Sequence, residues 1–129
     1  MAASYRDGRW TAYPECRTGI TLALATGPDG DVCFGTYRNG IIVYDGESYR
    51  GYDSTNSRLP HNMVTALAYD KQGRLWAGTC QGLLCINEDL QHVYTKENSG
   101  LLSNRIADLI TDDEGIWVAT DAGIAEYNQ

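Results

Sequence analysis

The sequence predicts an all-β chain built from repeated four-stranded sheets. The segment at residues 65–79 recurs at residues 107–120 and, more loosely, at residues 21–36, with a period of about 42 residues. Short segments rich in β-branched and aromatic residues lie between closely spaced turn residues, which favours antiparallel strands. Apolar residues at helical spacing do not continue beyond about one turn. Repeats of this length and pattern are typical of the blades of a β-propeller.

The middle repeat defines the strands of one blade. We expect strands at residues 64–69, 74–79, 83–87 and 90–95, joined by short turns. The first of these segments is apolar on both faces, as a strand between two neighbouring sheets must be. The fourth segment alternates between apolar and polar residues, as an outer strand should.

An aspartate and a glycine recur in the turn between the first and second strands. Asp70 and Gly73 of the middle repeat correspond to Asp112 and Gly115 of the third. Aspartate forms turns through hydrogen bonds to its own backbone, and glycine adopts a positive φ at little cost. We therefore interpret these aspartates as turn formers rather than metal ligands.

A tryptophan recurs in the second strand of the repeat. Trp76 and Trp117 occupy equivalent positions, and Cys33 replaces tryptophan in the first repeat. Large aromatic side chains on interior strands fill the wedge between neighbouring blades. We expect both tryptophans to pack in this way and Cys33 to be a small buried residue.

Counting strands along the chain gives three blades that are offset by one strand. We expect a single strand at residues 9–13, four strands each at residues 20–52 and 64–95, and three at residues 106–127. Closed propellers have about four to eight blades, and three blades would leave two apolar sheet faces exposed to water. We therefore predict a homodimer that forms one six-bladed ring by strand exchange, in which residues 5–13 complete the last blade of the partner.

The domain organisation follows from this count. A single half-propeller domain is expected over residues 1–129, with blade repeats at about 20–57, 58–100 and 101–129. Trp10 would anchor the seam between the two copies. Two alternatives stay open, namely that the chain is an excised part of a longer propeller and that three chains form a nine-bladed ring.

Composition and charge exclude several classes of partner. The 129 residues include 43% hydrophobic residues and carry a net charge of −7. Because no basic stripe is present to neutralise phosphates, we expect neither nucleic acid nor a membrane surface as a partner. The first 15 or so residues lack the apolar core of a secretory signal, and no apolar run approaches the roughly 18 residues of a membrane span. We expect a cytoplasmic protein, provided that Met1 is the native start.

The four cysteines do not form a recognisable zinc motif. There is no Cys-x-x-Cys pair, and the other spacings fit no common structural site. We predict that Cys33 and Cys85 are free, reduced thiols. Cys16 and Cys80 lie near predicted loops and are expected to be more exposed. No cofactor is expected.

The middle repeat resembles the two-component regulator propeller repeat. That pattern runs roughly Gly-Leu-Pro-x-Asn-x-Val, an Asp-x-x-Gly turn, Leu-Trp-x-Gly-Thr and Gly-Leu, and residues 58–64, 70–73, 75–79 and 82–83 match it closely. The third copy matches with a leucine in place of the proline and an alanine in place of the glycine. In this family the repeats form sensory propellers attached to histidine kinases or other output domains. The resemblance therefore implies a propeller fold and ligand sensing.

The candidate ligand site lies at one end of the propeller. Loops that join fourth to first strands and second to third strands emerge at the same end, near the axis, where ligands are usually held. The candidate ligand-binding residues are Tyr37, Arg38, His61, Asn62, Asn104, Arg105 and Asp121. His61 and Arg105 occupy neighbouring positions of equivalent loops and would suit a carboxylate or a sugar. The recurrence of Asn62 and Asn104 favours backbone capping of the loops over ligand contact.

The predicted function is a binding or sensory scaffold that holds a small polar ligand or a protein segment at this axial loop face. No catalytic residues are assigned, because no nucleophile elbow or other catalytic motif is present. The alternative is a metal-dependent hydrolase or lyase in which Asn62, Asn104 and Asp108 hold an axial divalent cation. A pure assembly role for another protein is a third possibility, and the sequence does not identify the ligand.

Overall fold

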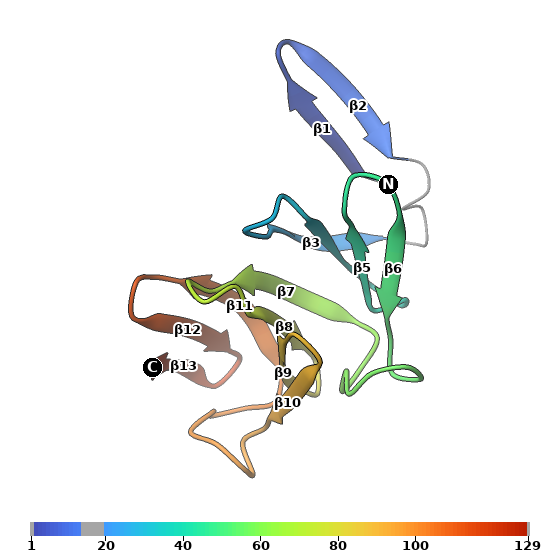
Figure 1. Ribbon diagram of the computed structural model, residues 1–129. Helices are drawn as coiled ribbons and strands as arrows, with labels where there is room; N and C mark the ends of the chain where they lie inside the picture. Colours follow the sequence, from blue (N-terminus) through green and yellow to red (C-terminus); the bar gives the residue numbers. More distant parts are fainter. Residues whose placement is uncertain (1, 14–19, 129) are drawn as a thin grey trace.

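The computed structural model describes residues 2–13 and 20–128, and all their regular structure is β (Figure 1). Thirteen strands form four antiparallel sheets, which confirms the all-β prediction. No helix occurs in these two ranges. The described residues thus include no helix that is long and apolar enough to span a membrane.

Three of the sheets follow the order of the repeats, and each is a meander of neighbouring strands. The first sheet consists of β3 (Thr21–Thr26), β4 (Val32–Thr36), β5 (Ile41–Tyr44) and β6 (Tyr49–Tyr52). The second consists of β7 (Val64–Tyr69), β8 (Leu75–Thr79), β9 (Gly82–Asn87) and β10 (Leu90–Tyr94). The third consists of β11 (Ile106–Thr111), β12 (Gly115–Thr120) and β13 (Gly123–Asn128). The strands predicted for the middle repeat are confirmed to within one residue at each end.

The three sheets pack face to face in chain order, with β7 in contact with both β3 and β11. One apolar layer lies between the first and second sheets and includes Val43 and Leu84. A second layer lies between the second and third sheets and includes Trp76 and Val118. Burial of these side chains from water is the main force that holds the stack together.

Glycines on the second strands of the first two blades permit the close approach of the next blade. A Cβ atom on Gly35 would lie 2.7 Å from Cγ1 of Val64, and one on Gly78 would collide with Ile106. The glycine in the Leu-Trp-x-Gly-Thr segment is therefore required by packing. The expectation that Gly115 adopts a positive φ, as Gly73 does, is wrong. Gly115 begins β12, where a Cβ atom would collide with the β13 backbone.

The N-terminal segment forms a hairpin rather than a single strand. β1 (Ala2–Arg6) pairs with β2 (Arg9–Tyr13), and the hairpin projects away from the three larger sheets (Figure 1). Asp7 and Gly8 both have positive φ, as a two-residue Asp-Gly hairpin turn requires. The prediction of β2 is confirmed, but the one-strand offset was incomplete because β1 was missed.

The outward faces of the first and third sheets are apolar and are not covered by the described residues. On β3, Leu22 and Leu24 are exposed, with 58% of Leu24 accessible. On the third sheet, Ile110, Trp117 and Ile124 are exposed. The expectation that Trp117 packs between blades is therefore not met within one chain, because none of the described residues forms a sheet against this face. Trp76 has such a neighbour and is buried, as predicted.

The described cysteines are free thiols. Cys33 and Cys85 are buried and Cys80 is half-buried, in agreement with the prediction for these three residues. Burial raises the pKa of the Cys33 and Cys85 thiols to about 11, so both are neutral at physiological pH. Cys16 lies outside the described residues.

Candidate functional site

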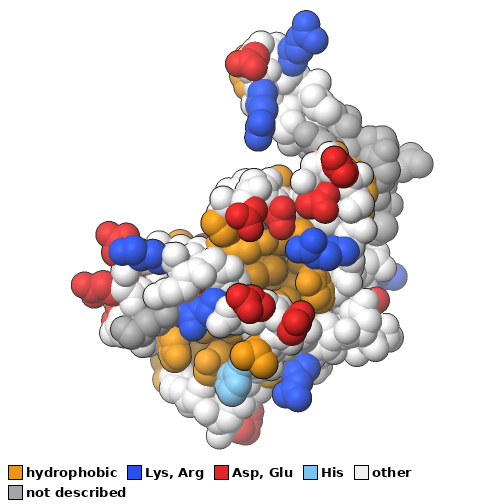
Figure 2. Space-filling view, in the orientation of Figure 1, with side chains coloured by type: hydrophobic (Ala, Val, Ile, Leu, Met, Phe, Trp, Pro, Cys, Tyr) orange, Lys and Arg blue, Asp and Glu red, His pale blue; other side chains and the backbone are white. Residues whose placement is uncertain are grey.

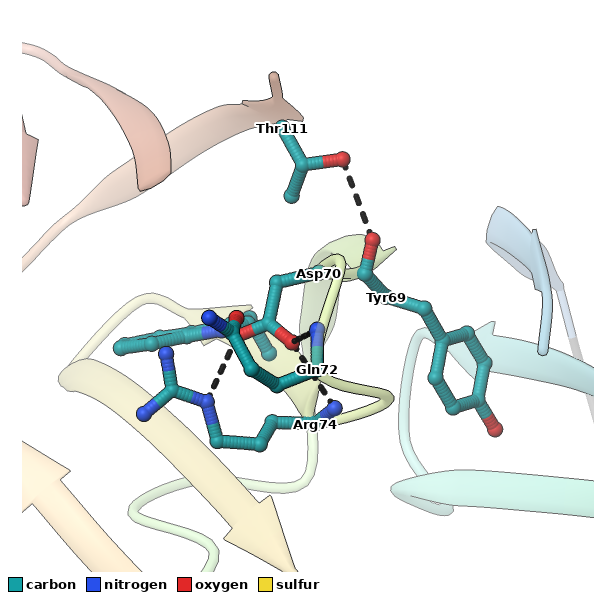
Figure 3. Close-up of polar contacts among 6 residues, drawn as sticks. Tyr69, Asp70, Gln72, Arg74 and Thr111 are labelled. Carbon is teal, nitrogen blue, oxygen red and sulfur yellow. Dashed lines mark hydrogen bonds and ion pairs between the residues drawn. The ribbon is translucent and has the colours of Figure 1, made fainter. Parts of the chain in front are cut away.

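A buried aspartate organises the first hairpin of the second blade (Figure 3). Oδ1 of Asp70 accepts hydrogen bonds from the backbone N–H groups of Gln72, at 3.0 Å, and Arg74, at 2.9 Å. Oδ2 accepts from Nε of Arg74 at 2.7 Å and from Nε1 of Trp76 at 2.8 Å. Burial alone would raise the pKa of Asp70, but the hydrogen bonds from Trp76 and Arg74 outweigh it and hold that pKa below its usual range. Asp70 is thus a turn former, as predicted, and it also fixes the tryptophan.

The third blade repeats this arrangement on its open face. Asp112 accepts hydrogen bonds from the backbone N–H groups of Glu114 and Gly115, and from Nε1 of Trp117 at 3.0 Å. The backbone bond from Glu114 and the Trp117 bond hold the pKa of Asp112 below its usual range. The aspartate–tryptophan pair is therefore a structural unit of the repeat, which explains the spacing of the two residues in the sequence.

Four of the predicted ligand-binding residues line one open hollow at the loop end of the first two blades. The hollow has a volume of about 470 Å³ and lies between the turn that joins β4 to β5 and the loop that joins β6 to β7. Its lining residues are Tyr37, Arg38, Ser54, Pro60, His61, Asn62 and Met63. A backbone hydrogen bond of 2.9 Å from the Gly40 N–H group to the Asn62 carbonyl joins the two segments.

The side chains at this hollow supply hydrogen-bond donors. The Cζ atom of Arg38 lies 5.5 Å from the centre of the exposed Tyr37 ring, within the range of a cation–π contact. Nδ1 of His61 accepts a hydrogen bond of 3.0 Å from the backbone N–H group of Met63. The ring proton of neutral His61 is therefore on Nε2. A guanidinium, an imidazole N–H and a phenol at one place suit a carboxylate or another group rich in oxygen atoms.

The two recurring asparagines shape the loops. Oδ1 of Asn62 accepts a hydrogen bond of 2.8 Å from the backbone of Ser54, and Oδ1 of Asn104 accepts one of 2.7 Å from the backbone of Lys96. The side-chain amide of Asn104 also donates to Glu97 at 3.1 Å, which holds the pKa of Glu97 below its usual range. Backbone capping, which the recurrence favoured, is the contact that both side chains make.

The remaining candidates lie elsewhere. Asn104, Arg105 and Asp121 belong to the loops of the third blade and do not line the hollow. Asp108 lies instead beside Ile110 on the outward face of the third sheet, where Oδ1 accepts a hydrogen bond from the adjacent backbone. The three residues proposed for an axial cation are thus not gathered at one place. In the part of the chain that the structure describes, no group of three or more His, Cys, Asp and Glu side chains is placed to hold a metal.

Three lining residues of the hollow were missed by the sequence analysis. Pro60 belongs to the Leu-Pro-x-Asn segment of the repeat, so the repeat pattern itself offered a signal for it. Ser54 and Met63 carry no such signal, because their position depends on how the β6–β7 loop folds back.

Solved structures with propeller-like folds resemble this chain. PorZ, a surface component of the type-IX secretion system of Porphyromonas gingivalis, has a TM-score of 0.69 and 25% identity, over 84% of this chain and 17% of PorZ. YCF48 bound to D1 peptide has a TM-score of 0.65 and 16% identity, over 94% of this chain and 40% of that one. A catalytically inactive virginiamycin B lyase from Staphylococcus aureus, with quinupristin, has a TM-score of 0.63 and 18% identity, over 95% and 46%.

This chain therefore spans less than half the length of each of these proteins. At identities of 16% and 18%, the likeness to YCF48 and to the lyase shows a shared fold alone. No curated protein matches the sequence.

One family model matches the middle repeat. Residues 58–81 match the model described as the two component regulator propeller. This span runs from the loop before β7 to the turn after β8, and it includes the Asp70 turn and Trp76. The match confirms the resemblance on which the sequence analysis relied. Within this chain, residues 58–81 are therefore similar to a two component regulator propeller repeat.

Proposed function

We propose that this chain is a binding scaffold whose loop end holds a small polar ligand or a protein segment through a carboxylate or a similar oxygen-rich group. The observation that carries the proposal is the hollow formed by Tyr37, Arg38 and His61. None of its lining residues is acidic, although the chain contains 17 aspartates and glutamates. A local cluster of donors on an acidic protein attracts anions to that place in particular.

The structural neighbours support a binding role. YCF48 is bound to a D1 peptide, and the inactive lyase variant was solved with quinupristin. Both are propeller-like chains that hold another molecule. The metal-dependent alternative is not favoured, because the residues that would hold the cation are dispersed between the loops and the outward face of the third sheet.

The scaffold would be complete as a six-bladed ring of two copies, because the open faces repeat the chemistry of an internal interface. Between the second and third sheets, Trp76 packs on one side, and Thr111 on the other donates a hydrogen bond of 3.1 Å to the Tyr69 carbonyl (Figure 3). On the open faces, Trp117 corresponds to Trp76, and the exposed Thr26 of β3 corresponds to Thr111.

The third sheet of one copy would then pack on the first sheet of the other copy. This contact would resemble the packing of the second sheet on the third within one chain. Burial of Leu24, Ile110 and Ile124 would remove large apolar side chains from water at each of two seams. A strand of the β1–β2 hairpin would pair with β13 of the partner, where β10 pairs with β9 in the second blade. Further blades of a longer chain are the competing occupant of these faces.

The binding proposal is tested by NMR titration with a peptide probe. Acetyl-trialanine with a free C-terminal carboxylate should shift amide signals of the β4–β5 turn and of residues 60–63, and its amidated form should bind more weakly. Arg38→Ala should reduce the affinity by roughly tenfold, as expected when a charged hydrogen bond is lost. Arg58→Ala is the matched control, because Arg58 is also exposed but lines a different hollow. Equal binding of both peptides, or equal binding by the Arg38 variant, would refute the proposal.

A further inference from the structure

The interface between the first and second sheets lacks the aspartate–tryptophan pair. Gly27 occupies the position of Asp70, since its N–H group bonds the Asp31 carbonyl as that of Asp70 bonds the Arg74 carbonyl. Cys33 occupies the position of Trp76 in the strand register, opposite an alanine of the first strand in both blades. The interface between the first and second sheets thus contains neither side chain of the pair.

Tyr69 of the second blade fills part of the resulting space. Its hydroxyl group lies 2.9 Å from Sγ of Cys33, and a Cβ atom on Gly27 would lie 2.9 Å from its ring. At the next interface, the strand register places the much smaller Thr111 at the position of Tyr69 and the large Trp76 at the position of Cys33. The first interface therefore has its small residue on the earlier blade and its large residue on the later blade, and the second interface has the reverse.

This arrangement does not fill the space completely. A recess of about 250 Å³ remains between the two sheets. Its apolar surface comes from Val43, Leu75 and Ile86, together with the tyrosines Tyr52 and Tyr69. Figure 2 shows an apolar recess on this side of the molecule, flanked by acidic and basic side chains. The volume is slightly below the range of about 300–1,000 Å³ found for drug-sized ligands, so it suits one small ring system.

The charged residues of the lining favour a cation. The lining contains three carboxylates, those of Asp29, Asp31 and Glu88, and one guanidinium, that of Arg50, which leaves two net negative charges. Arg50 forms an ion pair with Asp31, in which Nη2 of Arg50 lies 3.5 Å from Oδ2 of Asp31. Within the described residues, neither Asp29 nor Glu88 forms an ion pair. Their carboxylates are therefore available to an ammonium group, and the tyrosine rings add a surface that cations favour.

We propose that this recess is a binding site for small aromatic amines. The aromatic ring occupies the place that the indole of Trp76 fills at the next interface, and the ammonium group meets the carboxylates of Asp29 and Glu88. The site lies within one chain, so it depends neither on ring closure nor on the hollow at the loop end. It is therefore separate from the proposed function.

Calorimetric titration with tryptamine tests the site, with indole-3-acetate as the probe of opposite charge. We expect saturable binding of one tryptamine per chain and at least tenfold weaker binding of indole-3-acetate. The double variant Cys33→Trp with Tyr69→Thr recreates the pairing of the next interface and fills the recess. It should reduce tryptamine affinity at least tenfold, because the ring no longer fits.

Charge variants keep the test decisive if the double variant does not fold. Asp29→Asn and Glu88→Gln are changes at exposed positions and should each weaken tryptamine binding by about two- to fivefold. Asp89→Asn is the matched control, since Asp89 is exposed beside Glu88 but does not line the recess. The tryptamine affinity of this variant should equal that of the wild type. Arg38→Ala should also leave tryptamine binding intact. Absence of saturable tryptamine binding, equal binding of indole-3-acetate, or wild-type affinity in both charge variants would overturn the proposal.

Discussion

Replacement of Asp70 by alanine is the most informative single change in the fold. The carboxylate is buried and accepts four hydrogen bonds, two from backbone N–H groups and two from the side chains of Arg74 and Trp76. Alanine would leave the indole N–H of the buried Trp76 and the Nε–H of Arg74 without this acceptor. The Arg74 side chain has only 17% exposure, so water would not fully replace the lost carboxylate.

The expected loss of stability follows from this geometry. Removing one member of a buried ion pair costs about 3–5 kcal/mol, because the remaining charge stays desolvated without its partner. We therefore expect Asp70→Ala to lower the free energy of unfolding by about 3–5 kcal/mol. Since domains are stable by only about 5–15 kcal/mol, this change would bring the protein close to unfolding under ordinary conditions.

Equilibrium unfolding in urea, followed by tryptophan fluorescence and circular dichroism, measures this loss. Lys71→Ala is the matched control, because Lys71 lies exposed in the same turn and should change stability by no more than about 0.5 kcal/mol. A loss below about 1 kcal/mol for Asp70→Ala, or equal losses for the two variants, would refute the role given to this carboxylate.

Two further predictions concern titratable groups. Because the folded-state pKa of Asp70 lies below its unfolded value of about 3.9, its ionised form stabilises the fold above that pH and ceases to do so as pH falls through the folded pKa. The stability difference between wild type and Asp70→Asn should therefore be constant from about pH 7 to 5 and shrink below about pH 4 in urea titrations; a constant difference would contradict this. The second prediction uses a Cys16→Ser background at pH 8, in which a water-soluble disulfide reagent should react rapidly with the half-buried Cys80 only. Cys33 and Cys85 should react slowly, because burial raises the pKa of both thiols to about 11. Rapid reaction of three thiols would contradict that burial.

The strands were predictable from the sequence where turn residues bound them on both sides. The middle repeat is the clearest case, since β7 to β10 were placed to within one residue. β1 was missed, although the Asp7-Gly8 turn that joins it to β2 is a strong hairpin signal. The exposure of Trp117 could not follow from local pattern, because it depends on which sheet lies beside it.

The candidate site was predictable in part. Recurrence alone identified the capping role of Asn62, because the same hydrogen bond is needed in each loop of this kind. The propeller expectation placed Arg38 and His61 at the same loop end, but it paired His61 with Arg105, which does not line the hollow. The contributions of Ser54 and Met63 depend on the tertiary path of the loop. The recess between the first two sheets was missed, because its volume results from how Tyr69 packs and not from any motif.

The mass of the untagged chain in solution tests ring closure most directly. Light scattering coupled to size-exclusion chromatography should give about 28 kDa, twice the 14.2 kDa of one chain. Trp117→Glu, which places a charge on the open face of the third sheet, should dissociate this species, whereas Leu90→Glu, at an exposed position of the outer strand β10, should not. A stable wild-type species of 14.2 kDa would contradict the closure of two copies into one ring.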